Sequence, residues 1–465
     1  MSDAPPDSQT ARTLKLLSGP AIAALLWAWA VNADLGYPIA ITLAVTAWCA
    51  LWWLLEATGH AITALLPLAL FPIFGVLEPE QVAGAYGNPL ILLLAGGFMM
   101  AAALERNGAH RRMALGMVRL VGGGSGRRLV WGFALAAGLT SMWISNTATT
   151  LMLLPVAMAV LEKYPDRRLL APLVLAIAYS ASIGGLGTPI GSPPNLVFMQ
   201  VYEQTTGAGL GFTDWMRFGI PSVIVFLPLA ALWLGRGLAH TPAATLPELG
   251  PWRSGERRVL IVFALVALAW MTRSEPLGGW SSWLGLAGAN DASVALLGVV
   301  AMALVPDGRG ERLLDWQTAE RIPWGALILF GGGIAIATAF QSSGLSELAA
   351  SRMEGLFDLP LLLRIVLIAA AVSLMSEIAS NTATAVLLMP ILAAAGLALG
   401  VDPAILMVPA VLSASCSFML PVATAPNAIA FGSGLVSAQQ MLRHGAALNL
   451  IGVVVVSTVA FMLLR

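Results

Sequence analysis

The sequence predicts an all-α polytopic membrane protein built from two related halves. Of its 465 residues, 58% are hydrophobic and only 10% are charged. Soluble domains carry roughly 25% charged residues, so this chain has too few to cover a surface exposed to water. Apolar runs of the length that crosses a bilayer, about 20 residues, recur along the chain. In addition, "ISNTATTLMLLP" at residues 144–155 returns as "ASNTATAVLLMP" at residues 379–390.

The lengths of the apolar runs locate the expected membrane crossings along the chain. Residues 1–18 are polar and lack the apolar core and cleavage site of a signal peptide, so we expect a disordered cytoplasmic tail there. Eleven crossings follow, at 19–34, 38–56, 61–76, 88–105, 170–203, 217–236, 257–272, 291–306, 323–342, 403–437 and 445–464. Two of them, 170–203 and 403–437, are interrupted by the clusters "GTPIGSPPN" and "ATAPN", which predict broken helices.

Two further apolar stretches, 129–161 and 362–398, are too long for one crossing and too short for two. Each carries Ser-Asn-Thr near its middle. Arg127 and Arg128 precede the first stretch, and Lys163 follows it. Cytoplasmic loops collect Lys and Arg, so the first stretch is expected to enter and leave on the cytoplasmic side, as a re-entrant hairpin. Non-helical backbone at its tip must be buried in protein or line an aqueous cavity.

The charge bias supports this scheme over the whole chain. With a cytoplasmic N-terminus, most of the 24 Lys and Arg residues fall inside. The exceptions are Arg217, Arg273, Arg352, Arg364 and Arg465. The second hairpin has few flanking positive charges, so it is expected to open outward.

Similarity between the halves extends beyond the hairpins. "AGGFMMAAALERNG" at 95–108 aligns with "GGGIAIATAFQSSG" at 331–344, and the hairpins and helix breaks align at almost the same offset. We therefore divide the chain into a first repeat at 19–238, a cytoplasmic linker at 239–256 and a second repeat at 257–465, with scaffold and transport domains interleaved. Inverted repeats with discontinuous helices are typical of secondary transporters. The fold class expected is an inverted-repeat secondary transporter with eleven transmembrane helices and two opposed re-entrant hairpins.

The two hairpin tips and two helix breaks are expected to converge in the membrane. A broken helix exposes N–H groups at one end, which attract anions, and carbonyl oxygens at the other, which suit Na⁺. Ser, Asn and Thr side chains serve either ligand. A single Ser or Thr in a membrane helix often bonds only its own backbone, but the paired Asn146 and Asn381 favour a function. Because neither tip carries Lys or Arg, a bound anion would need a co-bound cation.

Other residues narrow the function. Glu377 has two interpretations: it attracts a cation or proton, or it makes a buried structural hydrogen bond; its repeat counterpart is Met142. Cys49 and Cys416 lie in apolar runs and are expected to be packing residues. Zero net charge gives no indication of a nucleic-acid partner. The core contains no set of nucleophile, metal ligands or paired acids that an enzyme requires, and an ion channel remains the alternative outside transport.

The two Ser-Asn-Thr motifs, with "GSPPN" and "ATAPN", resemble the divalent anion/sodium symporter (DASS) family of INDY-type transporters over about residues 19–464. The resemblance implies eleven transmembrane helices with two hairpins, a homodimer in the lipid bilayer of the inner membrane, and elevator motion of a transport domain against a scaffold. It also implies Na⁺-driven uptake of C4-dicarboxylates such as succinate, malate or fumarate. A sodium-independent dicarboxylate exchanger and a carrier of sulfate or citrate remain alternatives.

The resemblance also assigns a site. The implied substrate contacts are Ser145, Asn146, Thr147, Ser192, Ser380, Asn381, Thr382 and Thr424. The implied Na⁺ ligands are Ser141, Ser145, Asn146 and Gly191 in one site, and Ser376, Ala379, Asn381 and Ala423 in the other. Ser192 stands where the family usually has Thr, and it preserves the hydroxyl. Spans 19–34, 88–105, 217–236 and 323–342 are expected in the scaffold, and a surface helix is expected within 106–128.

Overall fold

Helices are the regular secondary structure of the part that the computed structural model describes. That part comprises residues 9–121, 125–162, 164, 166–238, 250–274, 278–286, 288–351 and 359–465, without the side chains of 349–351. It contains no β-strand, only an isolated bridge between Pro306 and Arg312, so the all-α prediction is confirmed. Residues 1–8 of the expected tail, 239–249 of the expected linker, Lys163 and Arg352 lie outside it.

The first helix begins before its expected start. Helix α1 (Gln9–Asn32) packs along α2 (Tyr37–Leu55), so the expectation of a disordered tail is wrong for residues 9–18. The Trp52 indole donates a hydrogen bond to the Leu16 carbonyl (3.2 Å). Such tertiary contacts stabilise a helical turn that is too polar to be recognised by its hydropathy.

A short helix, which the sequence analysis did not predict, lies between the third and fourth expected crossings. The segments are α3 (His60–Thr63), α4 (Leu65–Ile73), α5 (Pro79–Tyr86) and α6 (Pro89–Arg106). Helix α5 starts with a capping interaction in which the Gln81 side chain accepts from the Glu78 N–H (2.8 Å). Asn88 caps α6 by accepting from the Leu90 N–H (2.8 Å).

The remainder of the first half contains the hairpin and the broken helix. Its helices are α7 (Ala109–Val121), α8 (Gly126–Ser141), α9 (Asn146–Glu162), a 3₁₀ turn (Arg167–Leu169), α10 (Leu170–Gly184), α11 (Pro193–Thr206) and α12 (Phe212–Leu234). Helix α7 lies within residues 106–128, where a surface helix is expected. Helices α8 and α10 approach so closely that a Cβ on Gly184 would lie 2.0 Å from the Gly138 carbonyl oxygen. Glycine is therefore required at that crossing.

The second half repeats this order. Its helices are α13 (Ser254–Thr272), α14 (Trp280–Trp283), α15 (Asp291–Leu304), α16 (Trp316–Ala319), α17 (Trp324–Ser343), α18 (Leu345–Ser351), α19 (Leu361–Ile378), α20 (Asn381–Ala398), α21 (Ala404–Ala414), α22 (Ala425–Gly432) and α23 (Ala438–Leu463). Helices α19 and α20 form the second hairpin, and α21 and α22 are the second broken helix. Cys49 and Cys416 are buried free thiols.

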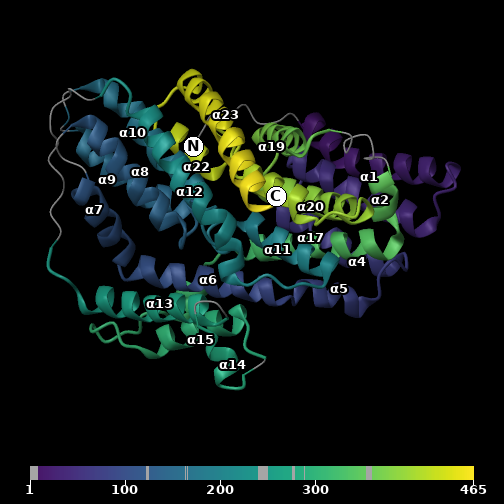
Figure 1. The fold of residues 1–465 in the computed structure, drawn as a ribbon, viewed down its shortest axis with the longest axis horizontal. Helices are drawn as coiled ribbons and strands as arrows, with labels where there is room; N and C mark the ends of the chain where they lie inside the picture. The colour runs from purple at the N-terminus through teal and green to yellow at the C-terminus, as the bar shows by residue number, and fades with distance from the viewer. Residues whose placement is uncertain are drawn as a thin grey trace.

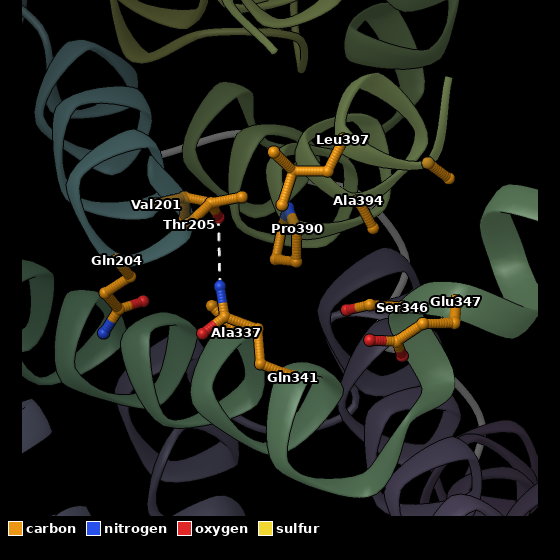
Figure 2. Close-up of a pocket in the computed structure, with 11 residues that line it drawn as sticks. Val201, Gln204, Thr205, Ala337, Gln341, Ser346, Glu347, Pro390, Ala394 and Leu397 are labelled. Carbon is orange, nitrogen blue, oxygen red and sulfur yellow. Dashed lines mark hydrogen bonds between the residues drawn. The ribbon is translucent and has the colours of Figure 1, made fainter. Parts of the chain in front are cut away.

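The two halves make matching contacts with each other. Helix α9 packs on α22 as α20 packs on α11, and α6 packs on α15 as α17 packs on α4. Within the halves, α8 and α10 contact α12 as α19 and α21 contact α23. In Figure 1, α13, α14 and α15 lie together beyond α6, whereas α1 and α2 lie at the other end of the molecule. The reciprocal pairing is what a duplicated fold with an approximate two-fold axis produces.

Nine helices in the described ranges are long and apolar enough to cross a membrane. Shorter apolar helices lie at His60–Ile73, Asn146–Glu162, Asp291–Leu304 and Ala404–Ala414. The chain is therefore a multi-pass membrane protein. Eleven crossings and the re-entrant course of the hairpins stay predictions, because a broken helix divides one crossing into short pieces and a hairpin arm can equal a crossing in length.

Candidate functional site

The tip of the first hairpin lies at its Ser-Asn-Thr motif. Helix α8 ends at Ser141 and α9 begins at Asn146. Ser145 caps α9, because its Oγ accepts from the Ala148 N–H (3.2 Å) and its carbonyl from the Thr149 N–H (2.9 Å). This capping starts the second arm at the motif and leaves the preceding residues to form the turn.

The Asn146 side chain joins this tip to the break between α10 and α11. One end of its amide lies 3.0 Å from the Ala181 carbonyl oxygen, 3.2 Å from the Gly191 carbonyl oxygen and 2.6 Å from Ser141 Oγ. With the nitrogen at that end, the amide donates to both carbonyls. With the oxygen there, oxygens face one another, and a cation among them is what would satisfy them.

The second hairpin repeats this junction. Ser376 Oγ lies 2.8 Å from Asn381 Oδ1 and 2.5 Å from the Ala414 carbonyl oxygen. Ser417 Oγ, within the second break, donates to Asn381 Oδ1 (3.3 Å). Both hairpins thus bring a Ser hydroxyl, an Asn amide and the carbonyl end of a half-helix together, with Ser141 and Ser376 fully buried. This donor set suits Na⁺, for which carbonyl, amide and hydroxyl oxygens are suitable ligands.

Each break is held open by an asparagine that the sequence reading did not single out. Asn195 Nδ2 donates to the carbonyls of Gly185 and Thr188 (both 2.8 Å). Asn427 Nδ2 does the same for Ser417 and Leu420 (3.1 and 3.0 Å). The signal was present in the repeated "PN" that ends both "GSPPN" and "ATAPN". These bonds satisfy carbonyls that the interrupted helix leaves without partners.

Glu377 stabilises the second break. Its carboxylate accepts hydrogen bonds from the backbone N–H groups of Phe418 (2.6 Å), Met419 (3.0 and 3.1 Å) and Leu420 (2.9 Å). The Asn449 amide adds a bond of 2.7 Å. Of the two interpretations given above, this geometry favours the structural hydrogen bond, because every contact is a donor that stabilises an anion.

The tips and breaks open on a shared cavity of about 1050 Å³. Of the residues expected in the site, those lining it are Ser145, Asn146, Thr147, Gly191, Ser192, Ser380, Asn381, Thr382, Ala423 and Thr424. Ser141 and Ser376 lie behind the tips, bonded to the asparagines. Ala379 ends α19, with its N–H bonded to the Met375 carbonyl (3.0 Å). Across the repeats, Ser192 Oγ lies 3.3 Å from Ser415 Oγ.

Four helix N-termini point to this cavity. The first residues of α9, α11, α20 and α22 all line it, and these residues belong to the two tips and the two breaks. An N-terminus carries a partial positive charge, so each favours an anion. Free N–H groups are not equal among the four, because α11 begins with Pro193 and Pro194, which have none, and the Asn195 N–H is bonded to the Ser192 carbonyl (3.1 Å). Lys15 of α1 is the one basic residue among its lining residues in the described structure, and Glu56 and Glu105 also line it. An anion near the tips is therefore held by helix ends and neutral groups.

A duplicated helical fold with interrupted helices around a central polar cavity defines the class of the protein: a multi-pass membrane transporter. Residues 50–408 match the family model described as "CitMHS: Citrate transporter". The chain belongs to this citrate transporter family, and the family is one of transporters rather than enzymes.

Two curated relatives agree with this placement. Sodium-dependent dicarboxylate transporter SdcS of Staphylococcus aureus (strain MRSA252) is 37% identical over 477 residues, covering 97% of this chain and 91% of the relative. The SdcS of Staphylococcus saprophyticus is 39% identical over 446 residues, covering 90% and 85%. Among solved structures, the YdaH transporter of Alcanivorax borkumensis matches with a TM-score of 0.63 at 16% identity, over 86% of this chain and 98% of that one. At that identity the likeness concerns the fold alone.

Proposed function

We propose that this chain couples Na⁺ entry to the uptake of C4-dicarboxylates such as succinate, malate and fumarate. The observation that carries the proposal is the convergence of four helix N-termini on one cavity. All four offer positive potential, and the hairpin arms α9 and α20 also offer N–H donors, without a fixed cationic side chain at the tips. The SdcS relatives are named sodium-dependent dicarboxylate transporters, which supports both the solute class and the ion.

In this proposal the dicarboxylate contacts the Ser-Asn-Thr motifs together with Ser192 and Thr424, and Na⁺ binds at the two junctions behind them. At the first junction, the ion would turn the Asn146 oxygen toward Ser141 and Gly191. Ser145, which caps α9, would support that site through its backbone. The second junction would bind Na⁺ in the same way, through Ser376, Asn381 and the backbone of Ala379 and Ala423. The bound cations offset the charge of the dianion, which explains why solute and ion move together.

The proposed mechanism is an elevator. The transport domain comprises both hairpins and both broken helices, and α6 and α17 belong to the scaffold. Helix α12 packs on α8, α10 and α23, so we assign span 217–236 to the transport domain instead of the scaffold. The cavity is lined by Lys15 and Glu105, near the predicted cytoplasmic end of the molecule. That location supports an inward-facing arrangement.

The proposed setting is the cell inner membrane, with a cytoplasmic N-terminus and two copies of the chain forming a homodimer. The bias of Lys and Arg toward one side supports this orientation. Accessibility of single cysteines introduced at Arg12 and Arg217 tests it: a thiol reagent that cannot cross the membrane should label intact cells only at residue 217. Cross-linking in the membrane tests the dimer.

Citrate is the second candidate solute, because the matching family model carries that name. A tricarboxylate would require the same neutral donors and one further positive contact. Lys15, which also lines the cavity, could supply this positive contact. Citrate competition therefore belongs in the same experiment.

The test is radiolabelled succinate uptake into proteoliposomes, with and without an inward Na⁺ gradient, competed by citrate and sulfate. Uptake should require the gradient, and Asn146→Ala and Asn381→Ala should each abolish it while the protein still inserts. Counterflow in the absence of Na⁺ would instead indicate an exchanger. Uptake at the wild-type rate in both variants would refute the proposed site.

A further inference from the structure

A second cavity lies outside the transport site, between α7 and the segment that leads into α13. Its volume is about 400 Å³, and its lining includes Arg111, Arg112, Trp252, Arg253 and Glu256. It shares no lining residue with the central cavity. Three arginines and one carboxylate give it a net positive charge.

Arg112 forms the wall of this cavity. Its guanidinium pairs with Glu256 (2.8 Å), donates to the carbonyls of Gly250 and Pro251 (both 2.9 Å) and lies 4.5 Å from the centre of the Trp252 ring. The charge of Glu256 is thereby balanced. The positive charge that remains belongs to Arg111 and Arg253, whose side chains are exposed.

The cavity lies at the boundary between the polar surface and the apolar belt of the molecule. Leu120 of α7 is 87% exposed, and Trp252 is 48% exposed directly before α13. About two and three turns into α13, Ile261 and Leu265 are 59% and 60% exposed, as lipid-facing residues are. Exposed tryptophans and basic amphipathic helices are typical of the level of the lipid headgroups.

We propose that this cavity binds the phosphate headgroup of an anionic phospholipid. Arg111 and Arg253 would pair with the phosphate, Trp252 would lie at the level of the glycerol, and the acyl chains would continue along α13. A headgroup fits better than a soluble anion because the positive charge adjoins the exposed Trp252 and lies at the start of α13, whose Ile261 and Leu265 are exposed further along. In the other half, the described residues of the counterpart helix α18 read "LSELAAS", and Arg352 follows them outside the described residues.

Such a lipid would act on the link between the two parts of the transporter. Helix α7 contacts both α6 and α8, so it connects the proposed scaffold to the first hairpin. A lipid bound there would fix the level of α7 relative to the bilayer. This consequence rests on the elevator proposal, whereas the binding itself does not.

Binding is tested by titrating the purified full-length protein with phosphatidylglycerol under native mass spectrometry, with phosphatidylcholine and inorganic phosphate as comparison probes. The wild type should prefer phosphatidylglycerol, and Arg111→Gln and Arg253→Gln should each weaken it about fivefold, as expected for one basic residue at an anionic surface. Arg167→Gln, an exposed arginine on the same predicted side, is the matched control and should leave binding unchanged.

Arg111→Lys combined with Arg253→Lys keeps the charge and should retain most of the preference, which separates loss of charge from misfolding. The proposal is overturned if the double glutamine variant binds phosphatidylglycerol like the wild type, or if phosphatidylcholine binds equally well. Displacement of the lipid by inorganic phosphate at equal concentration would likewise overturn it, because it would show a free-anion site. None of these readouts depends on which solute is transported.

Discussion

Replacing Glu377 by Ala should destabilise the second helix break. The carboxylate accepts from the N–H groups of Met419 and Leu420, and the Phe418 N–H has Asn449 Oδ1 (3.1 Å) as a second acceptor. The variant therefore leaves two backbone donors without a partner. Each costs about 1–3 kcal/mol, so the loss of stability is expected at about 2–6 kcal/mol. Glu377→Gln should cost less, because it keeps one oxygen acceptor but presents an amide N–H₂ to the remaining donors.

The assay is thermal unfolding of the detergent-purified protein, followed by Na⁺-dependent succinate uptake. Stability should be highest in the wild type, lower in Glu377→Gln and lowest in Glu377→Ala. Uptake should fall in the same order, because Thr424, an expected substrate contact, belongs to the helix break that Glu377 stabilises. Glu320→Gln removes an exposed carboxylate as the control and should unfold like the wild type. A Glu377→Ala variant with unchanged unfolding would refute the reasoning that this carboxylate holds the break.

Three further predictions follow from other contacts. A Cβ on Gly191 would lie 2.7 Å from a backbone carbonyl oxygen, so Gly191→Ala should lower stability by about 1–3 kcal/mol and remove most of the uptake. The reciprocal change in the other repeat, Ala423→Gly, should preserve uptake. Equal uptake by the two variants would contradict this prediction. Asp291 pairs with Arg273 at 2.6 Å with both side chains largely buried, so Asp291→Ala should lower stability by about 3–5 kcal/mol, and adding Arg273→Met should recover part of it in the same melting assay. Burial lowers the pKa of His110, so the unfolded chain binds more protons in acid and stability should fall as pH drops below about 6.5; His110→Gln should reduce this slope in melting curves recorded from pH 7.5 to 5.5.

Hydropathy and the internal repeat were enough to locate the long apolar helices of the described ranges, because an apolar run of membrane length has few alternatives to a helix. The same patterns missed the start of α1 at Gln9, since its first turns are polar and are held by Trp52. They also missed α5, which is short and depends on the Gln81 cap.

The candidate site was predicted in outline. The duplicated Ser-Asn-Thr motifs indicated which residues would meet, and most of them line one cavity. For Glu377 the sequence left two interpretations open, and for Asn195 the repeated "PN" gave the position but not the role. Both side chains act on backbone groups whose direction depends on how each broken helix is unwound. A sequence gives the position of a break but not the donors and acceptors that the break leaves free.

The exchange of partners between halves, with α9 lying on α22 and α20 on α11, has a consequence for how far one half could stand alone. A polypeptide of half this length would lack the partner that covers those helix faces here, so each half depends on the other to complete its packing. The dependence is not symmetric in every residue, because Glu377 serves the second break where the first half has Met142.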